Sequence, residues 1–328
     1  MSINQGWRCT SQGLVWQAFP HSPLAPGWAR LRLLVGGLCG TDLQILEGYA
    51  NFTGVLGHEF VAEVVQCEDP DWLGRRVVGE INVGCGQCSR CQVLNGQRFC
   101  EQRRVLGLRG LDGAFAESFD LPIKNLFAVD DLDPQLACFC EPMAAALEVL
   151  EHVPSGSEVL VMGDGRLGSL IALVLAGHSG HRVVVLGRHR HKLQRLQSMG
   201  LETATTLPSR QWPVVVEATG SASALAQAFE VCQPQGTVVV KSTVARPQEL
   251  NWSPVVIKAL RVVGSRCGPF GPALEWMRRG RVDPRPLVDK ILPLAQVPEG
   301  LAGMRQQGWV KVLISGDQFV ADGDARSQ

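Results

Sequence analysis

The sequence predicts an α/β protein with two domains, a barrel-like all-β domain followed by a doubly wound parallel sheet. Two observations support this prediction. Residues 1–140 contain short β-type runs separated by glycine and proline turns, which is typical of a compact all-β domain. From Glu158 onward, strand-like and helix-like runs alternate, as they do in βαβ units that build a parallel sheet. A chain of 328 residues is long enough to form two hydrophobic cores.

The individual elements can be expected in order along the chain. The first domain is expected to contain strands at Ala29–Val35, Glu59–Val65, Arg76–Val78 and Ala114–Phe119. The strong helix formers of Met143–Glu151 predict a helix that links the domains. The second domain is expected to contain strands at Glu158–Met162, Arg182–Leu186, Val214–Glu217, Thr237–Lys241 and Arg261–Gly264, with helices at Leu167–Ala176, Lys192–Met199 and Ala222–Val231. Last come expected helices at Ala273–Arg279 and Val297–Gln306 and a strand at Lys311–Ile314.

The composition argues against several classes of protein. Apolar residues make up 45% of the chain and charged residues 19%, as in ordinary globular proteins. The formal net charge is zero, which argues against nucleic-acid binding and electrostatic attachment to a membrane. The longest apolar runs, such as Leu170–Ala176, are too short to span a bilayer, and the N-terminal residues lack the apolar core of a signal peptide. We therefore expect a cytoplasmic protein that binds neither nucleic acid nor membrane.

Four of the eleven cysteines crowd into one short segment, at Cys85, Cys88, Cys91 and Cys100. In a reducing compartment such a cluster indicates metal ligation and not a disulfide framework. Zinc prefers four tetrahedral ligands, and a closed all-thiolate set is typical of a structural site. An iron–sulfur cluster is the alternative, but the spacing before Cys100 is longer than in ferredoxin runs and Glu101 replaces the usual proline. The pattern favours structural zinc.

A dinucleotide-binding fingerprint follows the first expected strand of the second domain. Gly163, Gly165 and Gly168 form G-x-G-x-x-G directly after a strand and at the start of a helix, the context that makes this motif specific. The phosphates of the cofactor would lie at the positive end of the helix dipole, next to Arg166 and Leu167. The alternative is a glycine-rich turn that binds no ligand.

The end of the next strand predicts which dinucleotide binds. An acidic residue about 20 residues past the fingerprint holds the ribose hydroxyls of NAD, but here Gly187 and Arg188 follow the strand and no carboxylate does. Glycine leaves room, and Arg188 can pair with a 2′-phosphate. The sequence therefore predicts NADP(H) in preference to NAD(H). The alternative is that Arg188 belongs to a solvated helix start.

A second group of residues has side chains that can bind a metal, but its members are dispersed along the sequence: Cys39, His58, Glu59 and Glu141. No spacing rule joins them, and each alone is ambiguous. Together with the cysteine run and the fingerprint, however, Cys39-Gly-Thr41-Asp42, Gly57-His58-Glu59 and Glu141-Pro142 occur in the order found in zinc-dependent medium-chain dehydrogenases/reductases. The chain resembles the alcohol, sorbitol and threonine dehydrogenases of this family from about Trp28 to Ile314. The resemblance implies a GroES-like β-barrel catalytic domain, residues 1–142 and 268–328, and a Rossmann domain, residues 143–267.

The resemblance also implies roles for individual residues. It makes Cys39, His58, Glu59 and Glu141 the candidates for a catalytic zinc, and the four clustered cysteines those for a second, structural zinc. Thr41 matches a relay hydroxyl, Glu59 is a further candidate for proton transfer, and Arg266 and Lys311 resemble cofactor-contacting positions. Gln44 stands where the family often has a histidine and cannot act as a base. Either water ordered by Gln44, or Glu59 or Glu141, would then handle the proton, or proton relay would be slow.

The activity implied is hydride transfer between an alcohol or polyol, or the matching aldehyde or ketone, and NADP(H) or NAD(H). A homodimer or homotetramer is expected by analogy with the family, since Arg261–Arg266 fits an edge strand. The alternative function is a non-catalytic NADP-binding sensor or scaffold that keeps only the structural zinc.

Overall fold

The computed structural model describes residues 3–178, 180–243 and 249–316. The chain divides into two compact units, one comprising Met1–Glu141 with Val288–Gln328 and the other Pro142–Leu287. None of the helices in the described residues is long and apolar enough to cross a membrane.

The first unit is built on a seven-stranded sheet with the order β11-β6-β5-β3-β19-β18, in which β10 also pairs with β3. The strands are β3 (Trp28–Gly37), β5 (Glu59–Gln66), β6 (Arg76–Gly79), β10 (Ser118–Pro122), β11 (Leu126–Ala128), β18 (Val288–Pro293) and β19 (Lys311–Ser315). A three-stranded sheet contains β1 (Ile3–Thr10), β2 (Gly13–Pro20) and β4 (Gly54–Val55), and another contains β7 (Asn82–Val83), β8 (Arg104–Leu106) and β9 (Gly110–Leu111). The helices are α1 (Gly40–Leu46), α2 (Pro134–Ala137) and α9 (Val297–Gln306).

Buried apolar side chains from these strands form one core. Alternate residues of β3, such as Leu31 and Leu33, are buried, as expected for a strand with one face on the core. Phe60 of β5 and Phe119 of β10 meet edge to face, with ring centroids 4.8 Å apart. The C-terminal strand β19 pairs antiparallel with β3. This pairing places β19 in the first unit, with Leu313 opposite Gly37.

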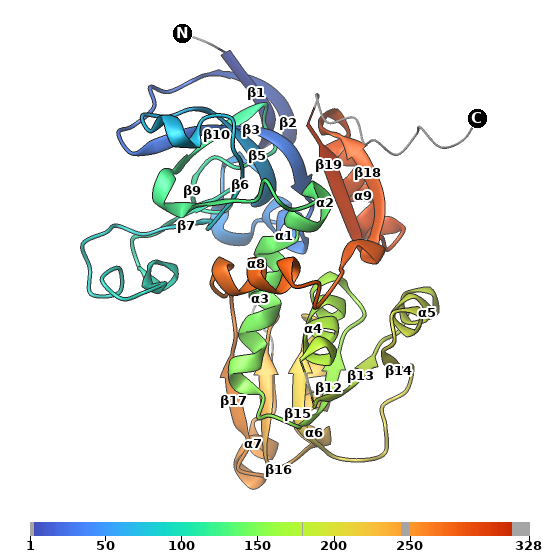
Figure 1. Cartoon of the computed structure of the whole chain (residues 1–328). Helices are drawn as coiled ribbons and strands as arrows, with labels where there is room; N and C mark the ends of the chain where they lie inside the picture. Colours follow the sequence, from blue (N-terminus) through green and yellow to red (C-terminus); the bar gives the residue numbers. More distant parts are fainter. Residues whose placement is uncertain (1–2, 179, 244–248, 317–328) are drawn as a thin grey trace. The chain divides into compact units, whose positions relative to one another are not determined.

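The second unit contains a six-stranded sheet in the order β14-β13-β12-β15-β16-β17, in which every pair is parallel (Figure 1). The strands are β12 (Glu158–Met162), β13 (Arg182–Leu186), β14 (Glu202–Ala204), β15 (Trp212–Glu217), β16 (Cys232–Val240) and β17 (Arg261–Gly264). The helices are α3 (Cys140–Leu147), α4 (Arg166–Gly177), α5 (Arg190–Ser198), α6 (Ala222–Val231), α7 (Ser253–Ile257) and α8 (Phe270–Arg278). The strand order reverses next to β12, and such a switch point is where ligands bind in open α/β sheets. The predicted fold class is confirmed.

The structure differs from the sequence prediction at the second domain boundary. The prediction returned the chain to the first domain at residue 268, whereas the structure keeps α8 in the second unit and makes the return at Val288. The reason is packing against the end of α4. The rings of His178 and Trp276 stack with centroids 6.3 Å apart, and a Cβ atom on Gly177 would lie 2.9 Å from Val282 Cγ2.

The strand predicted at Ala114–Phe119 is also displaced, because β10 begins only at Ser118. Phe115 instead donates its N–H to Leu56 O and accepts from Trp7 N, at 2.9 and 2.8 Å. Its ring is fully buried. The apolar run therefore packs as a connecting segment whose backbone is satisfied by β1 and by the residues after β4, and a strand pattern alone does not distinguish these cases.

Candidate metal sites and dinucleotide-binding loop

The antiparallel pairing of β3 with β5 brings three dispersed candidates together. Gly37 pairs with Glu59 at the ends of the two strands, which places Cys39, His58 and Glu59 at one edge of the sheet. The ligand atoms of these three side chains all lie within 4.8 Å of one another. A thiolate, an imidazole and a carboxylate at this separation are donors that zinc accepts, and three protein ligands leave a fourth position open. The residues therefore fit a catalytic zinc.

Asp42 supports this group from behind and was not assigned a role from the sequence. Its Oδ2 accepts the backbone N–H of Cys39 at 2.9 Å, which caps α1. Its Oδ1 lies 3.4 Å from His58 Nδ1, which leaves Nε2 of His58 for a metal. A carboxylate behind a ligating histidine orients the ring and increases its basicity. Burial opposes a charge on His58, but Asp42 and then Cys39 raise the pKa of the imidazole well above its usual value.

Glu59 forms a buried ion pair with Lys311 of β19. The ammonium group also donates to Leu38 O at 3.3 Å and lies 5.4 Å from the centroid of the Phe139 ring. Burial would lower the pKa of Lys311, but Glu59 and then Cys138 raise it, so the side chain is charged. The structure thus places Lys311 in the first unit, beside the metal candidates, and its expected contact with a cofactor stays a prediction.

Glu141 and Thr41 lie near the three-residue group but outside it. Burial raises the pKa of Glu141 to about 7, with His58 acting in the opposite direction and Glu59 in the same one. The charges of His58 and Glu59 thus act on this carboxyl group, but the group within 4.8 Å does not include it. Thr41 Oγ1 lies 3.7 Å from Cys39 Sγ. Direct ligation by Glu141 and a relay through Thr41 remain predictions.

The four clustered cysteines have the dimensions of a single-ion site. All four sulfur atoms lie within 4.8 Å of one another, with Cys88 to Cys100 at 3.7 Å and Cys85 to Cys91 at 4.0 Å. A tetrahedral zinc with Zn–S bonds of about 2.3 Å separates its ligands by about 3.8 Å. Backbone N–H donors lower the pKa of Cys85 to about 6, so this sulfur is available as a thiolate. The set fits zinc.

Two positions in the cysteine-containing segment must be glycine because neighbouring atoms leave no room for a side chain. A Cβ atom on Gly96 would lie 1.9 Å from Arg90 O, and one on Gly84 would lie 2.6 Å from Cys91 Sγ. Only Gly86 combines a positive φ of 76° with open space. The loop must therefore fold tightly to bring its sulfur atoms together.

The fingerprint loop has the geometry that its glycines predict. Gly163 has a φ of 126°, and a Cβ atom on it would lie 2.9 Å from Ala218 O. A Cβ atom on Gly168 would lie 2.2 Å from Gly163 O, so this glycine permits close packing of α4. Gly165 is the N-cap of α4 and a Cβ atom there would meet nothing within 4 Å. Arg166 begins the helix. Open space at the N-terminus of a helix suits a phosphate.

The turn after β13 binds a carboxylate from the fingerprint loop that the sequence rule did not find. Asp164, the second residue of the fingerprint, accepts the backbone N–H groups of Arg188 and His189 at 2.8 and 2.7 Å. It also accepts Nδ1 of His189 at 3.0 Å. Burial would raise the pKa of Asp164, but these donors hold it below its usual value. Arg188 itself is exposed.

The remaining cofactor candidate, Arg266, follows β17. It is exposed, and its carbonyl accepts Lys241 Nζ at 2.5 Å. Lys241 also donates to Ser265 Oγ at 3.1 Å. Arg266 therefore lies in the same unit as the fingerprint loop, and its expected contact with a cofactor stays a prediction.

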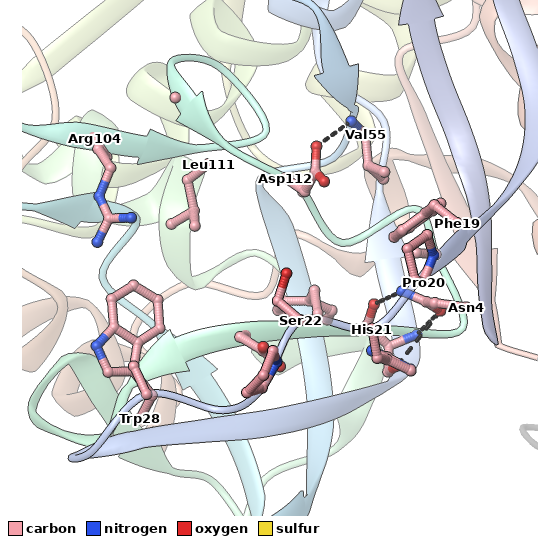
Figure 2. Close-up of a pocket in the computed structure, with 18 of the residues that line it drawn as sticks. Asn4, Phe19, Pro20, His21, Ser22, Trp28, Val55, Arg104, Leu111 and Asp112 are labelled. Carbon is pink, nitrogen blue, oxygen red and sulfur yellow. Dashed lines mark hydrogen bonds between the residues drawn. The ribbon is translucent and has the colours of Figure 1, made fainter. Parts of the chain in front are cut away.

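A separate pocket of about 510 Å³ lies within the first unit. Figure 2 shows Arg104 beside Trp28, whose ring centroid is 5.0 Å from the guanidinium carbon, and His21 near the backbone of Pro20. The His21 ring bonds to Ser118 Oγ at 3.0 Å. None of the metal-ligand candidates lines this pocket, so its shape has no bearing on their chemistry.

Family models match part of each unit. Residues 25–131 match the model of the alcohol dehydrogenase GroES-like domain, and residues 167–279 match that of the zinc-binding dehydrogenases. An L-threonine 3-dehydrogenase of Saccharopolyspora erythraea is 32% identical over 70% of this chain and 73% of its own length. D-arabinitol dehydrogenase 1 of Uromyces fabae is 26% identical over 87% of this chain and 88% of its own.

Solved structures show the same fold. An alcohol dehydrogenase (rspB) of Escherichia coli CFT073 complexed with NADH has a TM-score of 0.87 at 24% identity, covering 96% of this chain and 100% of that one. A protein of Sinorhizobium meliloti 1021 bound to NADP has the same TM-score, identity and coverage. The two relatives carry different forms of the nicotinamide cofactor, so likeness of fold does not decide between them.

Proposed function

Since the chain belongs to the zinc-dependent medium-chain dehydrogenase/reductase family, we propose that it is an enzyme that transfers a hydride between an alcohol or polyol, or the matching carbonyl compound, and a nicotinamide dinucleotide. The convergence of Cys39, His58 and Glu59 within 4.8 Å carries this proposal. A chain that had lost catalysis would have no chemical reason to keep three such donors together at the edge of its sheet.

In this proposal Cys39 and His58 hold the catalytic zinc, with Glu59 as a third ligand or a carboxylate next to the ion. When bound, the zinc acts as a Lewis acid that favours the alkoxide form of the substrate. Asp42 fixes the His58 ring, and Lys311 balances the charge of Glu59. One thiolate, one neutral imidazole and a carboxylate already paired with an ammonium group carry less negative charge than four thiolates. The ion is therefore left more positive, which suits an electrophilic site.

The proton of the alcohol needs a route to water, and Thr41 is the proposed relay. Its hydroxyl lies 3.7 Å from Cys39 Sγ and can accept a proton only while it passes its own proton onward. Gln44 cannot accept the proton as a base. Glu141 is the second candidate for moving it onward, since the charge of His58 acts on its carboxyl group. The residue Gln44 is also the one observation that favours the alternative function, a sensor or scaffold that binds the dinucleotide without turnover.

The second unit is proposed to bind the nicotinamide dinucleotide at the N-terminus of α4. Gly163, Gly165 and Gly168 leave the backbone open to the phosphates, and Arg166 at the first turn adds a positive charge. The sequence favours NADP(H) through Gly187 and Arg188. Asp164 favours NAD(H) instead, because its carboxylate already accepts the backbone N–H groups of that turn.

The four clustered cysteines are proposed to hold a structural zinc, so that the chain carries two zinc ions. None of the eleven cysteines is in a disulfide, which supports a reducing, cytoplasmic setting. Assembly through β17 is proposed as well. This strand lies at the edge of the sheet, and Val256 and Ile257 of the preceding α7 are 79% and 82% exposed. An exposed strand edge beside apolar side chains suits pairing with a second copy in a homodimer, or in a homotetramer built from such dimers.

Metal content and turnover test the proposal in one set of variants. Cys39→Ser and His58→Ala should each carry about one zinc per chain in place of two, retain NADH binding, and lose turnover of a panel of alcohols, polyols and aldehydes. Cys67→Ser is the control, because Cys67 lies outside both metal groups. Turnover by either variant without metal outside the cysteine lobe would contradict the zinc mechanism. Wild-type protein with a single zinc and no turnover would instead support the scaffold.

A further inference from the structure

The end of β13 is where a Rossmann domain usually presents an acidic side chain to the ribose of NAD. In this chain Gly187 occupies that position. The space that its missing side chain would need is not open. A Cβ atom built on Gly187 would lie 2.5 Å from Asp164 Cβ and 2.6 Å from Asp164 Oδ2. Asp164 therefore fills the place of the strand-end side chain from another element, and Gly187 has to be glycine to admit it.

The hydrogen bonds of Asp164 hold its carboxylate in that place. The consecutive backbone N–H groups of Arg188 and His189 both donate to Oδ2, at 2.8 and 2.7 Å. Nδ1 of His189 donates to the same carboxylate at 3.0 Å. Consecutive N–H groups in a turn form a binding site for an anion. Here that site is occupied by an anion that belongs to the protein.

We propose that Asp164 determines cofactor specificity by supplying, from the fingerprint loop, the carboxylate that β13 lacks, and that it thereby makes the protein prefer NAD(H) to NADP(H). This inference rests on the proposed function, because it requires a nicotinamide dinucleotide at Gly163–Gly168. It reverses the preference that Gly187 and Arg188 predict from the sequence.

Two physical effects point in the same direction. A 2′-phosphate at this turn would find both backbone donors already taken and would face a second negative charge. A ribose hydroxyl, in contrast, is a donor, and Oδ1 of Asp164 accepts only the His189 ring among the contacts of the described residues. Asp164 is 7% exposed and fixed by three donors, whereas Arg188 is exposed. The carboxylate of Asp164 is already ordered, so it can act on a ligand without a further loss of side-chain entropy. An exposed arginine must lose such entropy when it binds.

Dissociation constants for NADH and NADPH, measured by fluorescence titration of the full chain, test the inference without reliance on turnover. Wild-type protein should bind NADH at least about tenfold more tightly than NADPH. Asp164→Asn should shift the ratio of the two constants toward NADPH by about tenfold or more, because it removes the charge that repels the 2′-phosphate. Asp283→Asn is the matched control, since it removes one carboxylate from the same unit, where Asp283 pairs with Arg285. It should leave the ratio unchanged.

A second pair of variants moves the carboxylate from Asp164 to position 187. It separates the effect of the charge from any disruption of the turn after β13. Asp164→Gly should lower the preference for NADH, and addition of Gly187→Asp should restore it, because the second change returns the carboxylate to the strand end in the space just vacated. Tighter binding of NADPH by wild type, or an unchanged ratio in Asp164→Asn, would overturn the role of Asp164 alone. Wild-type protein that binds neither NADH nor NADPH would overturn the proposed function and this inference together.

Discussion

Replacement of Lys311 by methionine tests the buried ion pair beside the candidate catalytic zinc. The side chains of Lys311 and Glu59 are 4% and 2% exposed, so water cannot solvate the carboxylate once the ammonium group is removed. Methionine is similar in length and adapts to irregular spaces, so the substitution changes charge more than volume. The variant thus isolates the electrostatic role of Lys311.

Loss of one partner from a buried ion pair costs about 3–5 kcal/mol, because the other charge is left uncompensated. Both partners lie on strands that pair with β3, so we expect this loss in the stability of the sheet itself. Since about 1.4 kcal/mol corresponds to a factor of ten in an equilibrium constant, even the lower value predicts more than about a hundredfold faster hydrogen exchange. The double variant Glu59→Met with Lys311→Met should lie within about 1 kcal/mol of wild type, because it leaves no unpaired charge.

Hydrogen exchange followed by mass spectrometry is the suitable assay, since it reports opening of β3, β5 and β19 separately from the second unit. The measurements are made in a chelator, so that a bound cation does not compensate Glu59. Lys290→Met, an exposed lysine of β18, is the control and should change stability by less than about 0.5 kcal/mol. A loss in Lys311→Met no larger than that of the control, or a double variant as unstable as Lys311→Met, would refute the reasoning.

Three further predictions follow from single contacts. Asp42→Asn should weaken metal binding by Cys39, His58 and Glu59 about 10–100-fold, since the side chain next to His58 Nδ1 loses its charge. Competition for zinc with a chromogenic chelator measures this affinity, and an unchanged value would exclude the orienting role of Asp42. Gly187→Ala should destabilise the protein by about 1–3 kcal/mol in urea unfolding, because its Cβ atom would lie 2.5 Å from Asp164, and the cost should vanish when Asp164 is also glycine. Gly96→Ala should abolish zinc retention by the cysteine lobe, as its Cβ atom would lie 1.9 Å from a backbone oxygen, whereas Gly86→Ala should cost only about 1 kcal/mol; equal effects of the two would contradict the packing argument.

The parallel sheet could be predicted from the sequence because its signals are local. β12, β13 and β17 begin and end at the residues expected from the alternation of apolar runs and turns. Buried parallel strands are nearly continuous apolar runs, and such runs need no knowledge of their partners. The prediction of a strand at Ala114–Phe119 was wrong because such a signal is only local. An apolar run indicates that a segment is buried, but it does not indicate which groups form hydrogen bonds with its backbone.

The two metal groups show how far spacing carries a prediction of a site. The cysteine run is compact in sequence, so its four sulfur atoms had to lie close together in any folded lobe. Cys39 and His58, in contrast, meet only because β3 and β5 pair in a register with two irregularities. Register is set by side chains along both strands and by the turns between them, so these two residues could be joined from the sequence only through resemblance to a family.

The residues that sequence reasoning missed, Asp42 and Asp164, have a common physical character. Each lies within a quoted motif, is buried, and uses its carboxylate on a neighbouring functional segment: Asp42 on His58 and the backbone of Cys39, Asp164 on the turn after β13. A motif records which residue types recur, whereas the direction of a side chain depends on the backbone around it. A buried carboxylate must find donors to stay charged, so an aspartate inside a glycine-rich binding loop signals that some other segment is held there. At Gly187 a carboxylate from another element fills the space of the missing side chain. The absence of an acidic residue from a strand end therefore does not mean that the site lacks a carboxylate.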